Sequence, residues 1–275
     1  MRPPFGVGRG ERNAGMIEGI GPGDVLCALG DIVMPRKCIV CGRPLSLRER
    51  HLCIGCLADL PRTFFSGQRH NQMADRFNAL IQRDLDEGLA EGLHSQGLAS
   101  CRREEYAMAA ALFYYRSATG YRKITQRLKY HADLSAGRYF SSLLGKEMVE
   151  GGLFKDVDAV VPVPLHWTRR WSRGYNQAEV IAAVLAGILG APLYRNMLSR
   201  RRRTRTQTRM SVERKSRNVE GAFKAHVPDR VFRHILLVDD VFTTGATLHE
   251  CFKALRAVLP PDVRISVATL AVVGQ

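Results

Sequence analysis

The 275-residue sequence has no long hydrophobic run. Even the apolar stretch Val180–Leu189 is well short of the roughly 18 to 20 apolar residues that a membrane-spanning helix needs. The basic start, Met1–Gly10, is followed by Glu11 and Arg12 and not by the apolar segment of a secretion signal. These absences favour a soluble, cytoplasmic protein.

A disulfide framework is also disfavoured. Four of the seven cysteines are in paired spacing and three stand singly, in a large chain without a secretion signal. Hydrophobic residues make up 45% and charged residues 24%, which is typical of globular proteins. The length fits one α/β domain of ordinary size plus an accessory module.

Two common nucleotide-binding patterns are missing. No Gly-x-x-x-x-Gly-Lys-Ser/Thr run follows a predicted strand, which argues against a P-loop ATPase. The glycines at 6–10 are neither preceded by a strand nor followed by an apolar helix, as a dinucleotide fingerprint requires. Residues 1–23, rich in Gly, Arg and Pro, are therefore expected to be an unstructured tail.

Acidic residues are scarce between Arg195 and Arg217, where Glu213 is the only one. The net charge is +15, which implies anionic partners such as phosphates or nucleic acid. The segment 199–211 has almost no apolar anchors, so we expect a mobile excursion that closes over reacting groups or binds nucleic acid. A solvated charged loop is the alternative. The candidates for binding single-stranded DNA are Arg200, Arg201, Arg202, Arg203 and Arg205.

Four cysteines form two Cys-x-x-Cys pairs, Cys38 with Cys41 and Cys53 with Cys56. Four thiolates can converge on one tetrahedral zinc ion, and a closed four-sulfur site is structural, not catalytic. Because such a short stretch has little core of its own, metal binding would supply its folding energy. Two redox dithiols are the alternative, but those belong to the strand–helix junctions of larger βαβ units.

Hydrophobic periodicity divides the chain further. A short amphipathic helix and the cysteine module occupy 24–60, and a polar connecting segment with one helix at 77–93 occupies 61–105. For residues 106–275 the periodicity predicts strands at 108–115, 158–164, 235–238 and 264–273, and helices at 123–148, 176–189 and 246–258. This alternation predicts a parallel sheet covered by helices on both faces.

The strand at 235–238 ends at two carboxylates, Asp239 and Asp240, shortly before a helix. Ligands bind at such strand ends in parallel sheets. Hydroxyl donors, a glycine and a helix N-terminus suit a phosphate dianion, and here they come from Thr243, Thr244, Gly245, Ala246 and Thr247. The carboxylates suit ribose hydroxyls or a magnesium ion. A threonine-capped turn is the alternative, but capping leaves both carboxylates unexplained.

The run Val238–Thr247 closely resembles the phosphoribosyl pyrophosphate signature of type I phosphoribosyltransferases. The resemblance implies that fold, with a small N-terminal zinc ribbon added by the cysteine module. It implies that Asp239 and Asp240 contact ribose hydroxyls, with magnesium bound beside phosphoribosyl pyrophosphate. It also implies that the loop Thr243–Thr247 wraps the 5-phosphate.

A rigid and basic loop follows the strand at 158–164. Prolines end the strand and fix its geometry, and arginines follow where they could meet pyrophosphate. Ordinary packing residues and a solvated arginine face are the alternative. The candidates for binding pyrophosphate are Val163, Pro164, Arg173 and Asn176.

The combination of Val160–Pro164 with Arg173–Ala178 resembles the ComF family, which is associated with DNA uptake in competent bacteria. The resemblance covers roughly residues 107–275 and implies a link to DNA uptake or utilization, with a DNA-uptake helicase as a candidate partner. No stretch is identifiable as a nucleobase-binding hood. Two hypotheses follow: a phosphoribosyltransferase acting through Asp239, Asp240 and Arg173, or a non-catalytic single-stranded-DNA-binding protein that uses the fold as a nucleotide sensor or scaffold.

Overall fold

The computed structural model describes residues 36–92, 104–116, 119–130, 133–165, 174–200, 221–226 and 230–274. The predicted tail at 1–23 and the predicted helix at 24–35 lie outside these residues. Within the described ranges, no helix has the length and apolar character needed to cross a membrane.

The centre of the fold is a parallel sheet of four strands. Across the sheet the order is β1 (Ala109–Tyr115), β6 (Arg264–Val273), β5 (His234–Phe242) and β2 (Ala159–Pro162). Each neighbouring pair is parallel. The strands are apolar along most of their length because both faces of the sheet are buried. The predicted α/β fold is confirmed, and it is consistent with a type I phosphoribosyltransferase-like fold.

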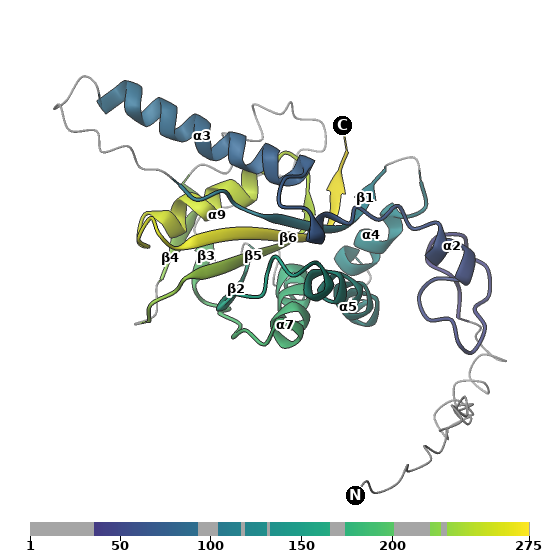
Figure 1. Ribbon diagram of the computed structural model, residues 1–275. Helices are drawn as coiled ribbons and strands as arrows, with labels where there is room; N and C mark the ends of the chain where they lie inside the picture. Colours follow the sequence, from purple (N-terminus) through teal and green to yellow (C-terminus); the bar gives the residue numbers. More distant parts are fainter. Residues whose placement is uncertain are drawn as a thin grey trace, which may run out of the picture.

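Helices cover both faces of this sheet (Figure 1). One face carries α3 (Gln72–Gly92) and α9 (Ala246–Arg256), and the other carries α5 (Leu134–Gly151) and α7 (Gln177–Leu189), with α4 (Arg122–Tyr130) beside α5. Short elements α2 (Ile54–Ala58) and η1 (Phe65–Gly67) precede α3.

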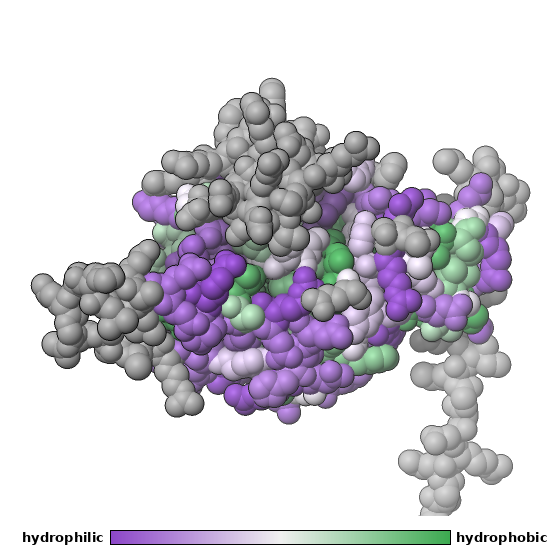
Figure 2. Space-filling view, turned by 90° about the horizontal axis from the view of Figure 1, so that it is seen from above, coloured by the Kyte–Doolittle hydropathy of each residue, from purple (hydrophilic) through white to green (hydrophobic). Residues whose placement is uncertain are grey.

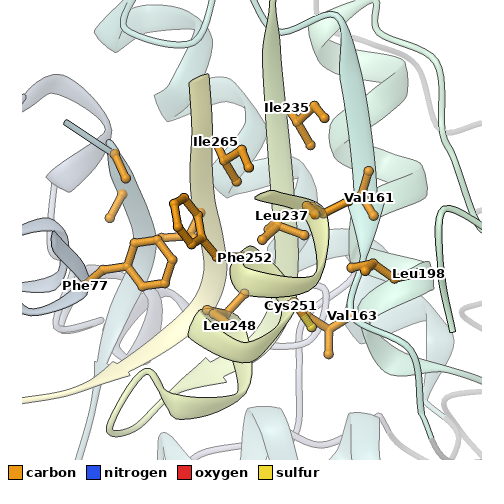
Figure 3. Close-up of a cluster of buried hydrophobic side chains, with 14 of the residues drawn as sticks. Phe77, Val161, Val163, Leu198, Ile235, Leu237, Leu248, Cys251, Phe252 and Ile265 are labelled. Carbon is orange, nitrogen blue, oxygen red and sulfur yellow. The ribbon is translucent and has the colours of Figure 1, made fainter. Parts of the chain in front are cut away.

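Side chains of β5 alternate between two cores. Leu237 belongs to the core under α3 and α9, whereas Leu236 and Val238 belong to the core under α5 and α7. In the first core, Phe77 of α3 and Phe252 of α9 pack against the strands, with their rings edge to face (Figure 3). This packing holds both helices against the strand that leads into the loop Thr243–Thr247.

The structure differs from the sequence predictions in three respects. The single helix predicted at 123–148 is wrong, because the chain forms α4 and then α5. Asp133 caps the new helix by accepting a hydrogen bond from the Ala136 amide at 3.0 Å, which the hydrophobic period does not reveal. Strand β5 continues to Phe242, so Asp239 and Asp240 lie within it. Two short antiparallel strands, β3 (Leu198–Arg200) and β4 (Phe223–Ala225), were not predicted.

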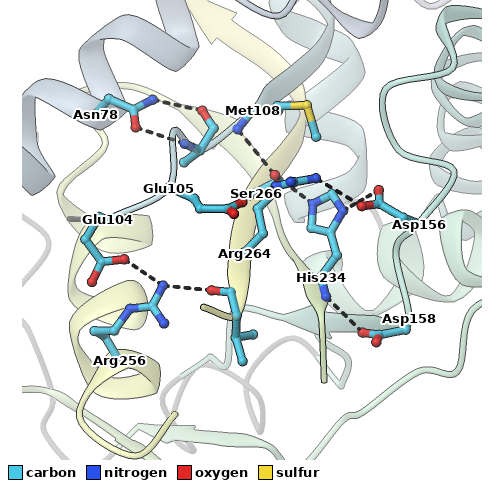
Figure 4. A network of polar contacts seen from close by, with 12 residues as sticks. Asn78, Glu104, Glu105, Met108, Asp156, Asp158, His234, Arg256, Arg264 and Ser266 are labelled. Carbon is cyan, nitrogen blue, oxygen red and sulfur yellow. Dashed lines mark hydrogen bonds and ion pairs between the residues drawn. The ribbon is translucent and has the colours of Figure 1, made fainter. Parts of the chain in front are cut away.

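A buried polar network joins β5 and β6 at their amino ends (Figure 4). The fully buried His234 contacts Asp156 Oδ1 through Nδ1 and Ser266 Oγ through Nε2, both at 2.8 Å. Burial lowers the pKa of His234, although the Asp156 charge opposes this shift. The network fixes the end of the sheet opposite the acidic turn, so we assign it a structural role.

Candidate functional site

The two predicted carboxylates lie on opposite faces of β5. Successive strand residues alternate, so Asp239 follows Leu237 toward α9 and Asp240 follows Val238 toward α4. Asp240 is 8% exposed, and its Oδ2 lies 2.9 Å from Nζ of Lys129. The strand therefore presents one carboxylate already paired with a cation.

Lys129, near the end of α4, is the main site residue that the sequence reasoning missed. Burial alone would lower its pKa, but the charges of Asp240 and Asp239 outweigh burial and raise it. The hydroxyl of Tyr175 donates to the Leu128 carbonyl, which ties this helix end to the loop before α7. Lys129 lies within residues 107–275, which the family resemblance covers, but no motif singled it out.

The surroundings of Asp239 raise its pKa above the usual range of a carboxyl group. Burial and the neighbouring Asp240 raise its pKa to about 7, and the charges of Lys129 and Arg200 act in the opposite direction. The Arg200 guanidinium lies 5.1 Å above the ring of Phe223. Arg200 thus lies in β3 and acts on the carboxylate, in contrast to the predicted mobile excursion. The other predicted nucleic-acid contacts, Arg201, Arg202, Arg203 and Arg205, lie outside the described residues.

The loop after β5 is built around Gly245. Its φ is +84°, and a Cβ added there would lie 2.8 Å from Cζ of Phe242 and 3.0 Å from Cδ1 of Leu80. Glycine alone fits this left-handed turn without strain. Ala246 begins α9, and its amide donates to the Thr244 hydroxyl at 3.4 Å, while Gly245 at the N-cap position has no side chain. The amides in the first turn of a helix lack partners within the helix, so the start of α9 beside Thr243, Thr244 and Thr247 suits an anion.

Arg76 of α3 contacts this loop directly. Its guanidinium donates to the carbonyls of Thr243 and Val273, the second at 2.9 Å, and lies 5.3 Å from the ring centre of Phe242. The segment 61–105, expected only to connect the modules, thus supplies a helix that shapes the site. No local pattern in the sequence identifies Arg76, because its partners are far away along the chain.

The end of β2 lies beside the end of β5. The Val163 amide donates to the Val238 carbonyl at 2.8 Å. The buried Asn176 donates to the Val163 carbonyl at 3.0 Å, and its Oδ1 accepts from the Ala178 amide at 3.2 Å, which caps α7. Val163, Pro164 and Asn176 are thus next to the acidic strand end, whereas Arg173 lies outside the described residues.

The four paired cysteines converge on one point. Their sulfur atoms all lie within 4.8 Å of one another, and Cys41 Sγ is 3.7 Å from Cys53 Sγ. Tetrahedral zinc with bonds of about 2.3 Å needs sulfur separations of roughly 3.8 Å. Burial opposes ionisation of Cys38, but the amides of Cys41 and Cys53 outweigh it and lower the pKa of Cys38 to about 6. The cluster of Cys38, Cys41, Cys53 and Cys56 can therefore hold a metal such as zinc.

Glu49 joins the two halves of the cysteine module. Its carboxylate accepts from the amides of Ser46 and Ile54, both at 2.7 Å. These amides lower the pKa of Glu49. The bonds fix the segment between the two cysteine pairs, so both pairs face the same point.

The cysteine module packs against the sheet domain through α4 and α5. Tyr121 donates to the Cys56 carbonyl at 3.0 Å, and Lys123 Nζ donates to the Val40 carbonyl at 3.1 Å. Leu52 belongs to the same buried core as Phe140 of α5. The module and the parallel sheet therefore share one hydrophobic core.

Comparison with known proteins identifies several relatives of this chain. No family model matches the chain. Competence protein F of Haemophilus influenzae is 26% identical over 234 residues, covering 83% of this chain and 94% of that protein. DNA utilization protein YhgH of Escherichia coli (strain K12) is 37% identical over 98 residues, covering 36% of this chain and 43% of that protein. Competence protein ComFC of Streptococcus pneumoniae is 29% identical over 154 residues, covering 56% of this chain and 64% of that protein. These relatives support the ComF family that the motifs resemble.

Proposed function

We propose that the protein binds phosphoribosyl pyrophosphate, or another compound carrying ribose 5-phosphate, at the end of β5 and serves DNA uptake or DNA utilization. The observation that carries this proposal is the left-handed turn at Gly245, which starts α9 a few residues after Asp239 and Asp240. The N-terminus of a helix suits a phosphate, and carboxylates suit ribose hydroxyls. The names of the relatives support the DNA-linked role.

Each part of the site has a proposed task. The amides and hydroxyls of Thr243–Thr247 bind the 5-phosphate, while Asp239 and Asp240 bind the ribose hydroxyls. Magnesium would neutralise the pyrophosphate when bound beside these carboxylates. The pyrophosphate contacts are proposed at Val163, Pro164, Arg173 and Asn176.

Lys129 and the cysteine cluster have supporting tasks. Lys129 holds the Asp240 carboxylate in one orientation, since its ammonium is 2.9 Å from that carboxylate. Zinc on the four cysteines holds the N-terminal module in shape and takes no part in chemistry, because four thiolates leave no open coordination position.

A phosphoribosyl transfer reaction and a nucleotide-sensing role both use this pocket. In the first, Asp239 and Asp240 orient the substrate and Arg173 stabilises the departing pyrophosphate. In the second, the pocket senses a nucleotide while Arg200, Arg201, Arg202, Arg203 and Arg205 bind single-stranded DNA. The relative named as a DNA utilization protein favours the second role, for which a DNA-uptake helicase is the proposed partner.

Calorimetric titration tests the shared pocket. Wild-type protein should bind phosphoribosyl pyrophosphate in the presence of magnesium, and Asp240→Asn should weaken binding by roughly tenfold because one charge-assisted contact is lost. Glu250→Gln removes a carboxylate from the side of α9 and is the matched control. Absence of binding by wild-type protein would contradict the proposal. Release of pyrophosphate with candidate acceptors then distinguishes transfer from sensing.

A further inference from the structure

A basic groove lies between the cysteine module and the start of α5, and it uses no residue of the phosphate loop. Its volume is about 450 Å³, within the range of roughly 300 to 1,000 Å³ typical of ligand sites. The module contributes Arg36, Lys37 and Arg50, and α4 contributes Arg127. Four cations thus line one concave surface.

Two of the four cations are held in place by the surrounding structure. Arg36 donates to the Glu49 carbonyl at 3.2 Å, and Arg127 lies 3.7 Å from the Asp133 carboxylate. Lys37 and Arg50 are exposed on the module surface. Because no acidic side chain lines the groove among the described residues, its charge favours a polyanion.

Apolar side chains lie beside these charges. Leu45 and Leu47 line the groove, and Leu47 is 50% exposed. The His51 ring also lines it, with its centre 5.3 Å from that of Tyr139 and its Nε2 3.2 Å from Ser135 Oγ. Figure 2 shows that the face in view is largely hydrophilic with scattered hydrophobic areas, some of them at the end of the molecule where the module lies. The groove therefore combines cations with surfaces on which flat rings can pack.

We propose that this groove binds single-stranded nucleic acid, with phosphates on Lys37 and Arg50 and bases against Leu47 and His51. Single strands are bound by the combination of a basic groove and apolar or aromatic surfaces that receive unstacked bases. A duplex would offer only its phosphates to such a recess. The inference rests on the DNA-binding role proposed above but assigns it a second surface, separate from Arg200–Arg205.

Fluorescence anisotropy with a labelled oligothymidylate tests the cations. In the zinc-loaded full chain, Lys37→Ala with Arg50→Ala should weaken binding roughly 2- to 30-fold. The slope of log affinity against log salt should become about 1.4 smaller, since each phosphate contact on a single strand contributes about 0.7. Lys146→Ala with Lys155→Ala removes the same charge from exposed positions outside the groove and should change binding less than twofold. Equal losses in both pairs, or none in the first, would overturn the proposal.

Base contacts are tested separately. Leu47→Ser should weaken binding of oligothymidylate at least threefold and leave binding of an abasic oligomer of equal length unchanged. Equal affinity of wild-type protein for the abasic oligomer, for a duplex or for polyglutamate would overturn the proposal, because it would make the groove a general anion site. Zinc content and binding of phosphoribosyl pyrophosphate should be unchanged in every groove variant. If wild-type protein fails to bind phosphoribosyl pyrophosphate, this result would contradict the proposed function but not the proposed groove.

Discussion

The ammonium of Lys129 lies 2.9 Å from the carboxylate of Asp240, and this ion pair joins α4 to the carboxyl end of β5. Both partners are largely buried, at 29% and 11% side-chain exposure. A largely buried carboxylate that loses its paired cation keeps its desolvation cost without the compensating attraction. The pair therefore couples the stability of the domain to the orientation of a proposed ribose contact.

Lys129→Met should lower the free energy of unfolding by about 1 to 3 kcal/mol, because it leaves Asp240 buried without its partner. Asp240→Asn in the same chain should restore part of that loss, since it removes the uncompensated charge. Urea unfolding of the two single variants and the double variant measures the coupling. Additive losses would show that the pair contributes no interaction energy.

Arg76→Met should weaken binding of phosphoribosyl pyrophosphate about tenfold, because the loop carbonyl of Thr243 loses its donor. Arg83→Met on the same helix removes a charge that pairs only with exposed Glu87 in the described structure, and it is the matched control. Calorimetry compares the affinity of each variant for phosphoribosyl pyrophosphate with that of wild-type protein. Equal affinities would show that Arg76 does not position the loop.

Purified protein should contain one zinc ion per chain, and Cys41→Ser should abolish stoichiometric zinc. The variant should also melt at a lower temperature, because the metal supplies much of the folding free energy of a short module. Cys251→Ala is the control, since this buried cysteine lies in the core under α9 and not in the cluster. Metal analysis of full-length protein that finds no zinc would refute the assignment.

Stability should fall as the pH drops below about 6.5, the ordinary pKa of histidine in an unfolded chain. Burial lowers the pKa of His234 in the folded state, so the unfolded chain takes up the proton first. The loss should continue until the pH reaches the folded pKa. His234→Asn removes this titration, and its stability curve should be flatter between pH 6.5 and 5. If stability changes with pH equally in the two proteins, His234 is not a source of this pH dependence.

The sequence predicted those parts of the site that are contiguous along the chain. The strand, the acidic pair and the loop from Thr243 to Thr247 lie next to one another, so residue types alone revealed the turn. Arg76 and Lys129 reach the same place through packing between distant segments. Local hydrophobic periodicity carries no information about such packing. The break between α4 and α5 was missed because the hydrophobic period continues across it, whereas the cap at Asp133 is a single side-chain contact.

The most direct test of the phosphoribosyl pocket compares two glycine variants. Gly245 and Gly190 both adopt a left-handed backbone, but only at Gly245 would a Cβ collide with the ring of Phe242, while Gly190 has open space at the end of α7. Titration with phosphoribosyl pyrophosphate and magnesium should show binding by wild-type protein and by Gly190→Ala, and at least tenfold weaker binding by Gly245→Ala. Equal binding by all three proteins, or no binding by wild-type protein, would contradict a phosphate site at this turn.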